Sequence, residues 1–136
     1  MILVDTGVIY AVADRADADH DACTQLLATH PGPLLVPTTV IVEAAWLIES
    51  RLGPAAEIAF LRSVRAGDLT RLDLIDPDWD RAADLVQTYA DLGLGLVDAS
   101  LVALAERLSV TTLATLNSRD FHVVRPAHTD AFTLLP

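Results

Sequence analysis

The sequence predicts an α/β fold in which helices cover both faces of a short, central parallel sheet. Short apolar segments typical of buried strands alternate with longer segments of helical periodicity along the chain. Breakers such as Pro31-Gly32-Pro33 and Gly53-Pro54 separate them. Strands that alternate with helices form parallel sheets covered on both faces. Because the 136 residues contain no repeat, low-complexity segment or linker, we expect a single domain spanning residues 1–136.

The first half of the chain is expected to contain two strands and four helices. Thr38 or Thr39 is placed to cap a helix, and Gly53-Pro54 ends that helix and opens the next in the usual order. In chain order we expect a strand at 2–5, a turn at 6–7 with a helix ending at 13, a helical segment at 18–29, a strand at 34–36, and helices ending at 52 and 65.

The second half continues the alternation. Polar and apolar residues alternate over 69–75, which favours a strand, and Asp76-Pro77 is typical of a helix start. We therefore expect a strand at 69–75, a helix beginning near 76, a helix at about 97–108, and strands at 111–115 and 132–135. Trp46, within an apolar helical stretch, is expected in the core, and the lone Cys23 is expected to be a small packed side chain.

Three acidic residues each stand alone in a long apolar stretch. They are Asp5 in MILVDTGVIYAVA, Glu43 in PTTVIVEAAWLI and Asp98 in LGLGLVDASLVALA. A buried, unpaired carboxylate is costly unless something compensates its charge. Asp5 ends the first expected strand, while Glu43 and Asp98 lie near helix starts. In parallel sheets, ligands bind beyond the carboxyl ends of the strands, so the three acids are expected to converge there around a shared cation.

The residue types at this predicted site indicate the kind of cation. All donors are oxygens, and no cysteine or histidine lies close to these motifs, which favours Mg²⁺ or Mn²⁺ over Zn²⁺. Mg²⁺ is commonly held by a few carboxylates together with substrate phosphates. Such a site is suited to phosphodiester hydrolysis by an activated water molecule.

The amino-acid composition argues against other classes of protein. The net charge of −10 argues against a broad nucleic-acid-binding surface, although a bound divalent cation reverses the local sign. All nine basic residues are arginine. No uncharged run is long enough for a membrane helix, and no basic region precedes an apolar segment at the N-terminus, so we expect a cytoplasmic protein with no membrane partner.

The ordered motifs resemble the PIN-domain family, and more narrowly the VapC ribonuclease toxins of bacterial toxin–antitoxin modules. The resemblance rests on Asp5-Thr6-Gly7 after a strand, VIVEAAWLI around Glu43, LVDASLVALAERL around Asp98 and LATLNSRDF at 113–121, and it covers almost the whole chain. It implies a three-layer α/β/α fold and a metal-dependent endoribonuclease, usually a homodimer held by a cognate antitoxin. It also implies that Asp5, Glu43 and Asp98 bind the metal.

One position departs from the family pattern. Where the family often has a fourth acid in Thr-x-Asp, this chain has Thr115-Leu116-Asn117. Asn117 is expected to offer a carbonyl oxygen or to hydrogen-bond a water at the site, without charge. Asp120, three residues later, either takes the place of the fourth acid or caps a turn before Phe121. The number of metal ions and the RNA that is cleaved stay open.

Each acid also has a structural alternative. Asp5 or Thr6 can cap the first helix, and Asp98 can be a first-turn helix acid. Glu43 can pair with Thr39 or Val40 in a capping box. A phospho-receiver is disfavoured because there is no lysine, and an aspartate-nucleophile phosphatase because Gly7 stands where its second acid would be. The rival of another class is a catalytically degenerate PIN-fold module that scaffolds a complex or binds RNA without cutting it.

Overall fold

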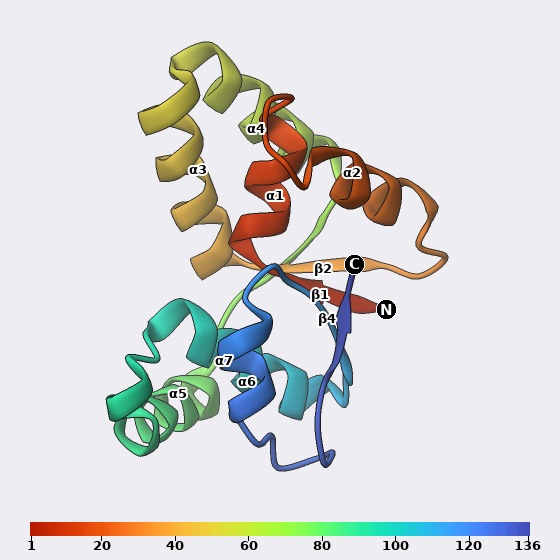
Figure 1. Ribbon diagram of the computed structural model, residues 1–136. Helices are drawn as coiled ribbons and strands as arrows, with labels where there is room; N and C mark the ends of the chain where they lie inside the picture. Colours follow the sequence, from red (N-terminus) through yellow and green to blue (C-terminus); the bar gives the residue numbers. More distant parts are fainter.

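A five-stranded, wholly parallel sheet forms the centre of the computed structural model, which describes residues 1–136 (Figure 1). Its strands lie in the order β3-β2-β1-β4-β5. Every pairing is parallel, with Leu3 of β1 opposite Leu35 of β2 and Leu113 of β4. The strands are β1 (Ile2–Val4), β2 (Leu34–Pro37), β3 (Thr70–Leu72), β4 (Thr112–Ala114) and β5 (Thr133–Leu135). The short parallel sheet predicted from the sequence is confirmed.

Helices cover the sheet on both faces. From β1 to β3 the chain moves across the sheet in one direction, through α1 (Thr6–Ala13), α2 (His20–Thr29), α3 (Thr38–Leu52) and α4 (Pro54–Ala66). It then returns in the opposite direction to β4 and β5 through α5 (Asp76–Thr88), the short 3₁₀ helix η1 (Ala90–Leu92), α6 (Leu96–Leu108) and α7 (Ser118–Val123). Because parallel crossovers are right-handed, this reversal puts the two groups of helices on opposite faces, as Figure 1 shows.

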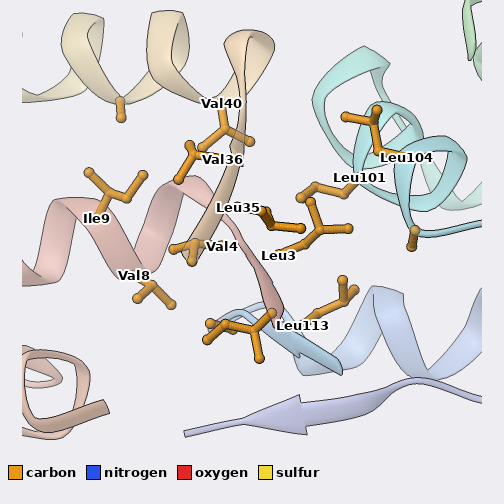
Figure 2. Close-up of a cluster of buried hydrophobic side chains, with 14 of the residues drawn as sticks. Leu3, Val4, Val8, Ile9, Leu35, Val36, Val40, Leu101, Leu104 and Leu113 are labelled. Carbon is orange, nitrogen blue, oxygen red and sulfur yellow. The ribbon is translucent and has the colours of Figure 1, made fainter. Parts of the chain in front are cut away.

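Buried aliphatic side chains join the three layers. All three residues of β1 are completely buried. Val8, Ile9 and Val40 pack on one face of the central strands, and Leu101 and Leu104 pack on the other (Figure 2). Strands buried on both faces are uniformly apolar, which explains why ILV and LLV, rather than alternating patterns, form β1 and β2. Cys23 is fully buried, as expected.

The helix boundaries follow the local chemistry of the chain. Pro54 opens α4, and Gly67, with φ of +90°, closes it in the left-handed conformation. None of the helices combines the length and the apolar composition needed to cross a bilayer.

Three expectations about these elements need correction. The strand expected at 69–75 is only Thr70–Leu72, because Asp73 and the residues after it leave the sheet to start α5. The helix α7 was not expected from the sequence. Trp46 is 64% exposed rather than buried in the core, since it lies on the outer side of α3.

The order in which the chain adds strands to the sheet reverses at β1 and β4, the two parallel neighbours at the middle of the sheet. The segment after β1 enters α1 on one face, and the segment after β4 enters α7 on the other. Such a reversal opens a crevice beyond the carboxyl ends of the two strands. Asp5 and Thr115 directly follow these strands, so the fold places them at the crevice.

Candidate functional site

The four residues predicted for the site line one pocket of about 560 Å³, which we call the acid pocket. Asp5 follows β1 and caps α1, Glu43 lies in the second turn of α3, Asp98 lies in the first turn of α6, and Asn117 follows β4. They come from both helical layers and from two strand ends. The fold therefore brings together residues that are up to 112 positions apart in the sequence.

Asp5 is buried and held by two hydrogen bonds. Its Oδ1 accepts from the Thr6 backbone N–H at 2.7 Å, so the residue does cap α1. Its Oδ2 accepts from the Thr115 hydroxyl at 2.8 Å. Burial raises the pKa of Asp5, with a smaller contribution from the charge of Glu43, and these two hydrogen bonds oppose the rise. Capping and a role in the site are compatible, because each carboxylate oxygen keeps a further lone pair.

Glu43 and Asp98 have no basic partner. The two salt bridges of the protein, Arg81–Glu106 and Arg107–Asp78, lie between α5 and α6 and involve none of the acids of the pocket. The capping box considered for Glu43 does not form, because the N-cap of α3 is Pro37 and no side chain caps the helix. The Thr39 hydroxyl bonds to Ser100 instead. The two carboxylates are therefore left without a compensating charge from the protein.

The pKa of Asp98 reflects this lack of a compensating positive charge. Burial raises its pKa to about 7, together with the negative charges of Asp5, Asp120 and Glu43. Three other carboxylates therefore act on the same group, while no positive side chain offsets them. A carboxyl group that is half-protonated near neutral pH in a pocket of like charges is a common mark of a functional site.

Asn117 takes a local structural role beside the acid pocket. It is the N-cap of α7, where its side-chain oxygen accepts from the Asp120 N–H at 3.4 Å. Its Nδ2 donates to the Asp120 carboxylate at 3.0 Å. The amide thus fixes Asp120, whose negative charge contributes to the raised pKa of Asp98. An aspartate at position 117 would repel Asp120 instead of holding it.

Two threonine hydroxyl groups at the site belong to the sequence motifs but were not among the predicted site residues. Thr115 is buried and bonded to Asp5, and its Oγ1 also accepts from the Asn117 N–H at 3.0 Å. Thr6 was considered as a helix cap, but Asp5 has that role, and the buried Thr6 hydroxyl has no hydrogen-bond partner within the protein. The signal available in the sequence was the position of Thr6 directly after Asp5 and of Thr115 two residues before Asn117.

The donors of the acid pocket match the preferences of a hard divalent cation. Asp5, Glu43 and Asp98 supply carboxylate oxygens, Asn117 supplies an amide oxygen, and no histidine or cysteine lines the pocket. No three side chains of His, Cys, Asp or Glu lie close enough together in the structure to share one ion. The acids affect one another's protonation at their present separation, but binding a common cation would require them to move closer.

The sequence is similar to known proteins over almost its whole length. A family model described as "PIN domain" matches residues 2–125. Ribonuclease VapC26 of Mycobacterium tuberculosis is 32% identical over 135 residues, which cover 99% of this chain and 100% of that protein.

Solved structures share the same fold. VapC20 of M. tuberculosis, described as a sarcin-ricin loop cleaving toxin, has a TM-score of 0.84 at 20% identity, covering 96% of this chain and 99% of that one. A toxin–antitoxin complex from Klebsiella pneumoniae gives 0.67 at 20% identity, covering 97% of this chain and 99% of the matched one.

Proposed function

The chain belongs to the PIN-domain family and, within it, to the VapC proteins, and on this premise we propose that it is a metal-dependent endoribonuclease, the toxin of a type II toxin–antitoxin module. The observation that carries the proposal is the convergence of Asp5, Glu43 and Asp98 in one pocket without a positive partner. Such a set of carboxylates is stable only with protons or cations bound.

We assign distinct roles to the three acids. Asp5 and Asp98 are the metal ligands, since both are desolvated and both have raised pKa values. Glu43, on α3, is a third ligand or orients the attacking water. Asn117 supports the site without charge, through its amide oxygen or by holding Asp120.

Mg²⁺ or Mn²⁺ is the cation we propose for this oxygen-rich site. Bound there, it would supply the positive charge that activates water at neutral pH and stabilises the leaving oxygen of the phosphodiester. The pocket contributes orientation through Thr115, which fixes Asp5. It contributes proton control through Asp98, whose carboxyl must release its proton before it can act as a ligand.

The non-catalytic alternative is not favoured. A degenerate module would have no need to keep three uncompensated carboxylates in one pocket, because their mutual repulsion destabilises the fold. The relative that matches the full chain is itself named a ribonuclease. Asn117 is the only departure from the expected acid set, and its hydrogen bond keeps a fourth carboxylate, that of Asp120, beside the pocket.

We further propose that a cognate antitoxin restrains the toxin by placing a basic side chain in the acid pocket. The pocket has four carboxylates in or beside it and no arginine in its lining. An antitoxin arginine would relieve the same repulsion that a cation relieves, so the two would compete. The net charge of −10 favours association with such a basic segment.

A homodimer is the proposed assembly, and the exposed apolar face of α3 and α5 is its proposed interface. Val42 and Trp46 of α3 are 65% and 64% exposed, and Trp79 of α5 is 49% exposed. They line a groove of about 630 Å³ next to the acid pocket. Exposed apolar clusters of this kind are typical of protein interfaces.

We propose that residues 1–136 act as one domain. We also propose that the protein works in the cytoplasm, with RNA as its substrate.

A growth experiment tests this function. The protein is expressed without its antitoxin as wild type, Asp5→Ala and Asp98→Ala, at matched levels confirmed by immunoblot. We expect only the wild type to arrest growth and to produce cut RNA with defined new ends. Growth arrest by the two variants, or absence of RNA cleavage by the purified wild type with Mg²⁺ or Mn²⁺, would contradict the proposal.

A further inference from the structure

A hydrogen-bond chain connects the two helical layers next to the acid pocket. Thr39 of α3 and Ser100 of α6 are 61 residues apart in the sequence, and their hydroxyl oxygens lie 2.6 Å from each other. The Ser100 hydroxyl also donates to the Val97 carbonyl at 2.7 Å. Because serine has a single hydroxyl proton, Thr39 must be the donor to Ser100. We call this chain, Thr39–Ser100–Val97, the layer bridge.

The two ends of the layer bridge lie at two acids of the pocket. Thr39 precedes Glu43 by four residues, so both side chains lie on the same side of α3, one turn apart. The Val97 carbonyl belongs to the peptide group whose nitrogen is that of Asp98. The layer bridge therefore runs from the helix turn before Glu43 to the peptide that carries Asp98.

The location of the layer bridge suggests what it does. Glu43 and Asp98 are on helices from opposite faces of the sheet, α3 and α6, and these helices contact each other where Thr39 meets Ser100. Ser100 is fully buried, and its hydroxyl is shielded from competing water. The Thr39–Ser100 bond is partly buried, and a hydrogen bond shielded from water holds two helices in place more strongly than an exposed one.

We propose that Thr39 and Ser100 are positioning residues, which limit the separation of Glu43 and Asp98 in the metal-free pocket, so that the two carboxylates have less distance to close when a divalent cation binds. This inference rests on the proposed metal-dependent function. It concerns the affinity of the metal-free protein for the cation, and neither residue touches the cation or the substrate. The acids repel one another in the metal-free pocket, and the layer bridge limits how far that repulsion can separate their helices.

The experiment measures Mn²⁺ binding to the metal-free protein by isothermal titration calorimetry, with thermal unfolding in parallel. Thr39→Val keeps the shape of the side chain and removes the donor. We expect it to weaken Mn²⁺ binding about tenfold, as the loss of a supporting hydrogen bond around metal ligands typically does. Thr39→Ser restores the donor, and we expect it to bind within about twofold of the wild type.

Thr38→Val is the matched control. It makes the same substitution one residue earlier on α3, but the Thr38 hydroxyl bonds to Leu72 and Asp73 at the end of β3, not to α6. We expect wild-type Mn²⁺ affinity for this variant. Ser100→Ala provides a second variant of the layer bridge, and its effect should not add to that of Thr39→Val, because both remove one link.

The outcomes separate this inference from the proposed function. If the wild type binds Mn²⁺ and Thr39→Val binds it equally well, the positioning role is wrong and the proposed function stands. If Thr38→Val weakens binding as much as Thr39→Val, general loosening of α3 explains the effect and the inference fails. If the wild type binds no divalent cation, both the function and the inference fail.

Discussion

The Thr115 hydroxyl donates a 2.8 Å hydrogen bond to Oδ2 of Asp5, which joins the ends of β4 and β1 at the chain reversal of the sheet. Both residues are buried. We expect Thr115→Val to lower the free energy of unfolding by about 2 kcal/mol, because hydrogen bonds to charged groups are among the stronger ones. Thr115→Ser keeps the hydroxyl and should retain most of the stability. Urea unfolding measures the difference in free energy of unfolding. If Thr115→Val were as stable as the wild type, the hydrogen bond would not hold Asp5 in place.

The protonation of Asp98 predicts how stability depends on pH. Its carboxyl has an ordinary pKa of 3.8, and burial with the charges of Asp5, Asp120 and Glu43 raises this pKa to about 7 in the fold. The folded state therefore binds the proton more tightly than the unfolded chain. This contribution to stability is complete below the ordinary pKa and is lost as the pH rises towards and through 7. The raised pKa of Asp5 acts in the same direction.

Unfolding of the metal-free protein at pH 5 and pH 8 checks this prediction. The free energy of unfolding of the wild type should fall between the two, and that of Asp98→Asn should fall less, because asparagine does not titrate. An identical pH dependence for both proteins would contradict the raised pKa. A saturating divalent cation should remove the loss at pH 8, since the cation binds the deprotonated carboxylates.

Asn117→Asp tests the neutral position of the acid set. The change replaces the Asn117 donor, 3.0 Å from the Asp120 carboxylate, with another negative charge. We expect a lower melting temperature without metal and tighter divalent-cation binding, so that the cation raises the melting temperature more than in the wild type. Differential scanning fluorimetry with chelator and with Mn²⁺ measures both. A variant that melts as the wild type does in chelator would show that Asn117 does not hold Asp120.

The ion pair between Arg107 and Asp78 provides a stability test away from the acid pocket. Asp78 is almost completely buried, and its Oδ2 lies 3.0 Å from Nη2 of Arg107. Arg107 is partly exposed, but its removal leaves the buried charge of Asp78 uncompensated, so Arg107→Met should cost about 2 kcal/mol of unfolding free energy. Mn²⁺ affinity should not change, because the pair lies between α5 and α6, outside the pocket lining. A change in affinity would show that the two regions are coupled.

The sequence predicted the strands and most helices because these depend on local patterns. It predicted that the acids gather in one pocket because the residues at the carboxyl ends of parallel strands lie at the same edge of the sheet. The apolar segments that form β1 and β2 are short and bounded by breakers, and the three isolated acids are visible as exceptions within apolar stretches. The helix α7 was missed because SRDFHV is too short to show a period, and its start depends on the side chain of Asn117.

Other features depend on contacts between residues far apart in the sequence. Thr39 was considered as the partner of Glu43, four residues away, but its hydroxyl bonds Ser100 of another helix. Trp46 was expected in the core because it is large and apolar. Hydrophobicity does not reveal which side of α3 faces the sheet, and Trp46 lies on the other side. The closeness of Thr115 to Asp5 follows from the pairing of β1 with β4, which local patterns do not specify.

The proposed function requires Asp5, Glu43 and Asp98 to bind a divalent cation that the protein uses to cleave RNA. Its most direct test is cleavage of a structured RNA by the purified protein, first in chelator and then after Mg²⁺ or Mn²⁺ is restored. The variants Asp5→Asn and Asp98→Asn are compared with Asp130→Asn, which makes the same change at an exposed residue outside the pocket. We expect cleavage only with the cation, and loss of more than about a hundredfold in the two pocket variants alone. Cleavage that persists in chelator, or an Asp98→Asn variant as active as Asp130→Asn, would contradict the account.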